Sequence, residues 1–75
     1  MKELVEYIVK SIVRDPDKVS VTTEDSEEGL LIKLDVAPED KGRVIGKQGR
    51  VVEAIRTILR VKAVKEGTIV RLQIP

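Results

Sequence analysis

The stretch Gly42-Arg43-Val44-Ile45-Gly46-Lys47-Gln48-Gly49-Arg50 lies just past the middle of the chain. It holds three glycines, a residue used where a side chain would block a close approach or a left-handed turn. Basic residues surround these glycines at four positions: Lys41, Arg43, Lys47 and Arg50. A regular amphipathic run follows over residues 51–64. An approachable, positively charged backbone that leads into a helix N-terminus is suited to hold phosphate.

The charge of the chain is divided unevenly, although its formal net charge is only +1. Residues 41–65 carry eight basic residues against one acidic residue, a net charge of +7. Residues 1–40 carry five basic residues against eleven acidic ones, a net charge of −6. Such asymmetry between the two halves of a sequence indicates a polyanionic partner.

Length and composition limit the classes of function. A chain of 75 residues is expected to form one domain, 1–75, with a small core. Tyr7 is its one aromatic residue, so base stacking on aromatic side chains is largely excluded. Cys and His are absent, which removes thiolate chemistry, the usual general base and the commonest metal ligand. We therefore expect no enzyme, no cofactor and no metal site.

No apolar run approaches the ~20 residues that span a bilayer. The acidic, amphipathic N-terminal segment does not resemble a signal peptide. We therefore expect a cytoplasmic protein that does not associate with membranes.

Apolar residues spaced three and four apart predict three helices. Their expected ranges are 2–14, about 38–45 and about 50–63. Pro16 ends the first helix, and Pro38 suits the first position of the second, where Glu39 and Asp40 favour the helix dipole. The buried stripe of the third helix is expected at Val51, Ile55, Ile58 and Leu59, widened by Val52, Ala54 and Val61. Arg56 and Arg60 are expected on its solvated face.

Alternating, β-branched segments predict three strands, at 19–23, 30–36 and 68–74. The polar, acidic turn 24–29 joins the first two into an antiparallel hairpin. A right-handed crossover through the two later helices sets the third strand parallel to the second. The element order αββααβ then gives an α+β fold, in which a three-stranded mixed sheet carries three helices on one face.

The glycine stretch does not fit two common nucleotide-binding loops. The P-loop pattern G-x-x-x-x-G-K-[ST] needs one residue more than the three between Gly42 and Gly46, and Gln48 replaces the hydroxyl that binds magnesium. Val44 breaks the pattern G-x-G-x-x-G. The three serines lack a general base that could activate them, which again argues against catalysis.

The succession of strand, short helix, V-I-G-K-Q-G turn, long helix and strand resembles the KH RNA-binding motif, whose signature is an I-G-x-x-G turn between two helices. Residues 45–49 match this signature without a departure. The additional helix and strand before this core resemble the type II KH domain of prokaryotes. The resemblance covers the whole chain, which is similar to the small stand-alone bacterial KH proteins of the KhpA (YlqC) family.

This resemblance implies binding of single-stranded RNA through the GxxG loop and an adjacent groove. Gly46 to Gly49 would pass close to the sugar-phosphate backbone. Lys47 would supply positive charge and Gln48 a neutral donor, while Arg43 and Arg50 would flank the groove. Val44 and Ile45 would line the apolar floor under the bases, and we expect Ile45 to be the more buried of the two.

The resemblance also implies a partner and a process. Members of this family pair with a second KH protein of the KhpB/Jag group, so a homodimer or such a heterodimer is expected. The implied role is that of an RNA chaperone or a post-transcriptional regulator.

A protein-interaction or dimerisation module with incidental nucleic-acid binding is the alternative. It would explain Leu31 and Ile69, apolar residues on strand faces that should be exposed. Single-stranded DNA also stays open as a ligand, because backbone contacts distinguish it from RNA only through the 2′-OH.

Overall fold

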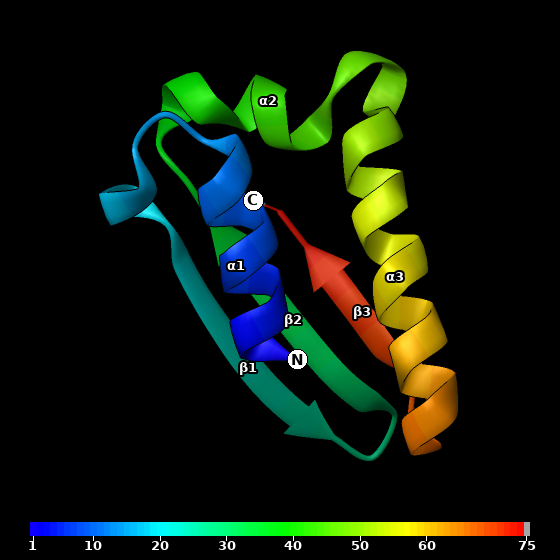
Figure 1. The fold of residues 1–75 in the computed structure, drawn as a ribbon. Coiled ribbons are helices and arrows are strands. Elements are labelled where there is room, and N and C mark those ends of the chain that lie inside the picture. The colour runs from blue at the N-terminus through cyan, green and yellow to red at the C-terminus, as the bar shows by residue number, and fades with distance from the viewer. Residues whose placement is uncertain (75) are drawn as a thin grey trace.

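The computed structural model describes residues 1–74. Its helices and strands follow the expected order, and Figure 1 shows their arrangement. They are α1 (Lys2–Ile12), β1 (Ser20–Ser26), β2 (Gly29–Asp35), α2 (Lys41–Ile45), α3 (Arg50–Glu66) and β3 (Val70–Gln73). Single turns of 3₁₀ helix lie between them at Pro16–Lys18 and Pro38–Asp40, and Lys47–Gly49 form a further tight turn whose Gln48 has a non-helical conformation. None of the helices within residues 1–74 has the length and apolar character needed to cross a bilayer.

The sheet has the predicted topology. Its strand order is β1-β2-β3, with β1 antiparallel to β2 and β2 parallel to β3. The helices cover one face of this sheet, and α2 lies across the end from which α3 descends beside β3 (Figure 1). The α+β prediction is therefore confirmed, and β3 remains an edge strand along which α3 runs.

The core lies between the sheet and the helices. Ile32 and Leu34 of β2 are fully buried, and they face Val5 and Val9 of α1 and Leu59 of α3 within one apolar cluster. Burial of each such side chain stabilises the fold by about 1.5–3 kcal/mol relative to exposure. Because this cluster joins α1, β2 and α3, it fixes the frame on which the glycine turn is held.

Several element boundaries differ from the sequence prediction by one to three residues, and for three of them the structure shows the reason. α1 ends two residues early, because Val13 is already extended with φ −79° and ψ 159°. β1 continues through Ser26, because its pairing with β2 extends to a two-residue turn at positions 27–28. α3 continues to Glu66 and ends at Gly67, whose left-handed φ of 70° suits a helix C-terminus.

The buried stripe of α3 also differs from the prediction. The buried residues are Val52, Ile55, Leu59 and Ala63. Ile58 and Val61, expected inside, are 48% and 58% exposed. Apolar residues occur almost all the way round this helix, so their spacing alone could not identify the face that meets the sheet.

Asp40 has a role that the sequence did not indicate. Its carboxylate is 1% exposed and accepts hydrogen bonds from the backbone N–H groups of Arg14 and Asp15, each at 3.1 Å. It lies in the first turn, as expected, but its side chain makes no capping hydrogen bond to its own helix. Asp40 therefore ties the segment that follows α1 to the start of α2.

Candidate nucleic-acid interface

The chain changes direction between α2 and α3 within residues 46–49 (Figure 1). α2 ends at Ile45, and the N–H of Gly46 still donates to the carbonyl of Gly42 at 2.8 Å. Gly46 then turns the chain with φ 78° and ψ 172°, and Gln48 and Gly49 are both left-handed, with φ 58° and 73°. The N–H of Gly49 donates to the carbonyl of Gly46 at 3.1 Å, which closes the turn.

The two glycines of this turn are required for different reasons. A Cβ on Gly46 would collide with the side chain of Val51, so packing as well as the positive φ excludes other residues there. A Cβ on Gly49 would meet nothing within 4 Å, so only the φ of 73° favours glycine. The space above Gly49 is open, and a ligand can approach the backbone at this point.

Four basic side chains surround the turn: Lys41, Arg43, Lys47 and Arg50. Within residues 1–74, none of them has a carboxylate within 4.0 Å, whereas Lys33, Arg56 and Lys62 are each paired with a glutamate. Arg50 donates through Nη2 to Oε1 of Gln48 at 3.2 Å, a bond between two exposed side chains. The positive charge at the turn is thus available to an external anion.

Ile45 was expected to be more buried than Val44, and this prediction is wrong. Val44 is 0% exposed and belongs to the core cluster, whereas Ile45 is 39% exposed at the end of α2. α2 has only five residues, which is too short a run for periodicity to decide which of two adjacent apolar side chains faces inward. An apolar side chain therefore lies at the surface directly before the turn.

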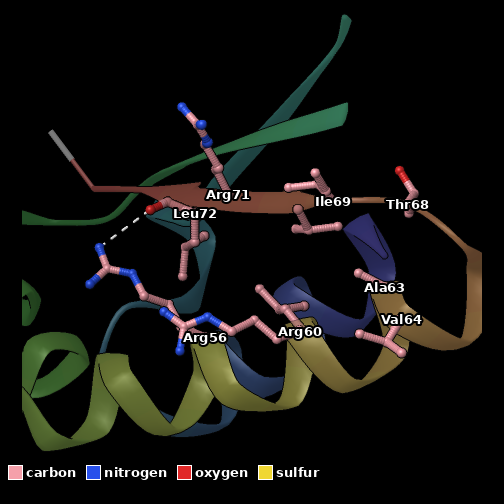
Figure 2. Close-up of a pocket in the computed structure, with 10 residues that line it drawn as sticks. Arg56, Arg60, Ala63, Val64, Thr68, Ile69, Arg71 and Leu72 are labelled. Carbon is pink, nitrogen blue, oxygen red and sulfur yellow. Dashed lines mark hydrogen bonds between the residues drawn. The ribbon is translucent and has the colours of Figure 1, made fainter. Parts of the chain in front are cut away.

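A groove runs between α3 and the edge strand β3, and Figure 2 shows the side chains that line it. Its volume is about 630 Å³. Leu59 and Ala63 of α3 and Leu72 of β3 are its buried residues. No local pattern in the sequence indicates this groove, because its two walls come from elements that meet only through the crossover.

Arg56 stands at the end of this groove nearer to the glycine turn. Its Nη1 donates to Oε1 of Glu53 at 2.9 Å, and its Nη2 donates to the backbone carbonyl of Leu72 at 3.3 Å. Arg56, expected on the solvated face of this helix, is half-buried against β3, whereas Arg60 is exposed as predicted. Arg71 points to the side of β3 away from α3 (Figure 2).

Comparison with known proteins places these features in a family. Residues 2–74 match the family model described as KhpA/KhpB, KH domain. The chain is 50% identical to the RNA-binding protein KhpA of Clostridium acetobutylicum, with 99% of each chain covered. It is 46% identical to that of Listeria monocytogenes and 45% identical to that of Aquifex aeolicus, with 99% of this chain and 97% and 94% of those relatives covered. No solved structure matches the chain.

Proposed function

Because the chain belongs to the KhpA/KhpB family of KH domains, we propose that it binds single-stranded RNA through residues 46–49 and the groove between α3 and β3. A KH turn of this kind clamps about four backbone nucleotides. The relatives are named RNA-binding proteins, and no catalytic activity is proposed for this chain. Its place of action would be the cytoplasm.

The open approach to Gly49, beside four basic side chains that have no carboxylate within 4.0 Å among residues 1–74, is the observation that carries this proposal. Phosphates would lie over the turn, where Lys47, Arg43 and Arg50 supply charge and Gln48 a neutral donor. Ile45 would offer an apolar contact to a base or sugar. Val44 would not touch a base, because its buried side chain packs in the core and supports the end of α2.

The double variant Lys47→Asp with Gln48→Asp tests the turn. Both side chains are exposed, and aspartate tolerates the left-handed conformation of position 48, so the fold should survive. Fluorescence polarisation with a short single-stranded RNA should show loss of binding, because the net charge of residues 46–49 changes from +1 to −2. An unchanged dissociation constant would mean that RNA does not use this turn.

A control with the same change of charge is Lys2→Asp with Thr22→Asp. Both positions are exposed, on the first turn of α1 and on β1. This variant should retain most of the affinity. A salt titration adds an independent measure: with three or four phosphates neutralised, log K should fall with log salt at a slope of about −2 to −3. A flat response would contradict phosphate contact.

A second copy of the chain or a KhpB/Jag-type KH protein is the proposed partner, and RNA chaperoning or post-transcriptional regulation the proposed process. One KH site with few stacking aromatics should bind weakly, so two linked sites would raise the overall affinity. Size-exclusion chromatography with light scattering, with and without RNA, measures the assembly. A strict monomer on RNA would contradict pairing between two copies.

A protein-interaction module remains the second candidate function. Ile58, Val61 and Val64 are exposed along α3, and a hollow of about 410 Å³ lies between α1 and α3. Leu31, expected at an interface, is half-buried, while Ile69 is exposed. The variant Ile58→Asp should disrupt assembly but leave RNA binding by the monomer measurable if the first function is primary. If Ile58→Asp abolished assembly, and neither the variant nor the unaltered protein bound RNA, the protein-interaction function would be favoured.

A further inference from the structure

Tyr7 is the one aromatic residue of the chain, and its side chain lies at the surface of α1. It is 73% exposed, because it stands midway between Val5 and Val9, which α1 buries in the core, and so projects from the opposite side of the helix. The hydroxyl of Ser11 donates to the backbone carbonyl of Tyr7 at 2.7 Å, a contact that does not involve the ring. An exposed apolar side chain is ordinary by itself, so the neighbours of the ring decide what it can bind.

The neighbours of Tyr7 on the side toward α2 are basic. Lys10 lies one turn after Tyr7 on the same side of α1, and its side chain is exposed. Among residues 1–74, no carboxylate lies within 4.0 Å of its ammonium group. Residues 7–14 carry two basic residues and no acidic one, whereas residues 2–6 carry one basic residue against two acidic ones. Tyr7 therefore stands where the charge along α1 changes from negative to positive.

The positive end of α1 is joined to the start of α2. The N–H of Arg14 donates to Oδ1 of Asp40 at 3.1 Å, and Lys41 follows Asp40 as the first residue of α2. Figure 1 shows this end of α1 beside α2, whose far end leads into the glycine turn. A series of basic residues without a carboxylate within 4.0 Å in the described part of the chain thus connects the turn with Tyr7: Lys47, Arg43, Lys41, Arg14 and Lys10.

Two acidic residues lie next to this junction in the chain. Asp15 is paired with Lys18, whose Nζ lies 3.9 Å from its Oδ2. Glu39 is exposed, and no cation lies within 4.0 Å of it among residues 1–74. Its charge reduces the attraction of this surface for an anion. The surface is therefore suited to extend a site at the turn rather than to hold a nucleic acid without it.

From this arrangement we infer that an RNA strand held at residues 46–49 continues along α2 to the end of α1, and that one of its bases stacks on the ring of Tyr7. This inference rests on the proposed function and adds a contact outside the turn and the groove. The phosphates before the stacked base lie at Arg14 and Lys10. The contact accepts any base, because every base has a π-face.

The length of RNA that reaches Tyr7 follows from the helices in between. Residues 41–46 and residues 7–12 each span about 7 Å of helix, so about 15 Å of helix separates the turn from Tyr7. The turn holds about four nucleotides. A dodecamer leaves eight more, which span about 27 Å even at the stacked spacing of about 3.4 Å per nucleotide. A dodecamer can therefore occupy the turn and Tyr7 together, whereas a tetramer cannot.

The intrinsic fluorescence of the unaltered protein tests the contact directly, because Tyr7 is its one tyrosine and tryptophan is absent. Saturation with a uridine dodecamer should quench the emission, because a base stacks on the ring. A tetramer bound at the turn should leave the emission unchanged. Free N-acetyltyrosinamide in the same titration corrects for the light that RNA absorbs. Unquenched emission in protein that polarisation shows to be saturated with the dodecamer would overturn the inference.

A second copy of the chain is the other molecule that could cover this ring. Leu4, one turn before Tyr7, lines the hollow between α1 and α3. A dilution series without RNA distinguishes the two. Emission that stays constant per molecule supports the inference, whereas quenching that grows with protein concentration would assign the ring to a contact between copies and overturn it.

The variants Tyr7→Leu and Tyr7→Phe separate the ring from the rest of the side chain. Tyr7→Leu should weaken the dodecamer about fivefold to tenfold, as expected for one stacked base, and leave the tetramer unchanged. Tyr7→Phe keeps a ring and should bind both like the unaltered protein. Equal effects of Tyr7→Leu on the two RNAs, or no effect on either, would overturn the inference and leave the proposed function intact. A dodecamer that does not bind the unaltered protein would overturn both.

Two exposed lysines of α1 give a matched pair for the phosphates. Lys10→Gln removes a cation beside Tyr7, and Lys2→Gln removes one from the acidic end of the same helix. For the dodecamer, Lys10→Gln should make the slope of log K against log salt shallower by up to about 0.7, the value for one phosphate of a single strand. Lys2→Gln should leave the slope unchanged. Equal slopes in the two variants would contradict the path along α1.

Discussion

Two four-residue turns in this protein, residues 26–29 and 46–49, have a similar residue pattern but opposite surroundings. Each carries two long polar residues before a glycine of positive φ. In the hairpin turn, a Cβ on Gly29 would collide with the carbonyl of Ile69, which accepts the N–H of Leu30 at 2.8 Å. In the turn between α2 and α3, the space above Gly49 is empty.

The two turns also differ in charge. The hairpin turn carries Glu27 and Glu28, whereas the other turn carries Lys47 and Gln48 with further cations around it. A glycine covered by a neighbouring strand serves packing, and a glycine that faces open space lets a ligand approach the backbone. The covering of the glycine and the charge of its neighbours, rather than the turn itself, therefore distinguish a structural turn from one that a ligand can approach.

The largest expected effect on stability is that of Gly29→Ala. Its φ is 131° and its Cβ would meet backbone, so β2 and β3 would have to separate locally, at a cost of about 3 kcal/mol. Gly49→Ala meets no atom and should cost only the left-handed penalty, about 1 kcal/mol. Urea denaturation of both variants measures the difference.

The expected effects of the two variants on RNA affinity have the opposite order. Gly49→Ala places a methyl group where a phosphate would lie, so it should weaken binding more than Gly29→Ala does in protein that is still folded. Equal losses of stability in the two variants, or an unaffected affinity in Gly49→Ala, would contradict the division between covered and open glycine.

Asp40→Ala should have the next largest effect, because it removes the tie between α2 and the segment after α1. Two backbone donors, the N–H groups of Arg14 and Asp15, would lose their partner, at a cost of about 2 kcal/mol. Hydrogen exchange should become faster in residues 41–49 and stay unchanged in residues 26–29, which pair within the sheet.

The adjacent carboxylate gives the control for this prediction. Glu39→Ala removes an exposed side chain and should change the free energy of unfolding by less than about 0.5 kcal/mol. If Asp40→Ala accelerated exchange in both turns equally, the bond would serve the whole fold rather than the basic turn.

Asp40 also shows which kind of contact could not be predicted from the sequence. The strand order, the crossover and the glycine turn were predictable, because alternation, helical spacing and I-G-x-x-G are local patterns. The partners of Asp40 lie 25 and 26 residues away in the chain. They are backbone groups, so no pattern of residue types indicates these contacts. The same holds for Arg56, whose acceptor is the carbonyl of Leu72.

The errors at Val44 and Ile45 and along α3 have another cause. Apolar side chains there are more numerous than the core can accept, so Ile45, Ile58 and Val61 are left at the surface. Spacing predicts that a helix has an apolar face, but tertiary packing decides which of several candidate faces is buried.

The smallest expected effect comes from Gln48→Gly and concerns a strain present in only one of the turns. Gln48 is the one non-glycine residue with a positive φ within residues 1–74, and neither Glu27 nor Glu28 shares this conformation. Removing its Cβ should gain about 1–2 kcal/mol of relieved strain and lose about 0.5–1 kcal/mol through the greater freedom of the unfolded chain. The net gain of about 0.5 kcal/mol would raise Tm by about 3 °C.

The matched variant is Glu28→Gly in the hairpin turn. It has no left-handed strain to relieve, so it should only lose stability, by about 0.5 kcal/mol. If both glycine variants lowered Tm alike, Gln48 would carry no strain, and the two turns would differ in charge and covering but not in backbone energy. If Gln48→Gly raised Tm and also weakened RNA binding, the strained glutamine would be present for its contact with the ligand, since the fold alone is better served by glycine.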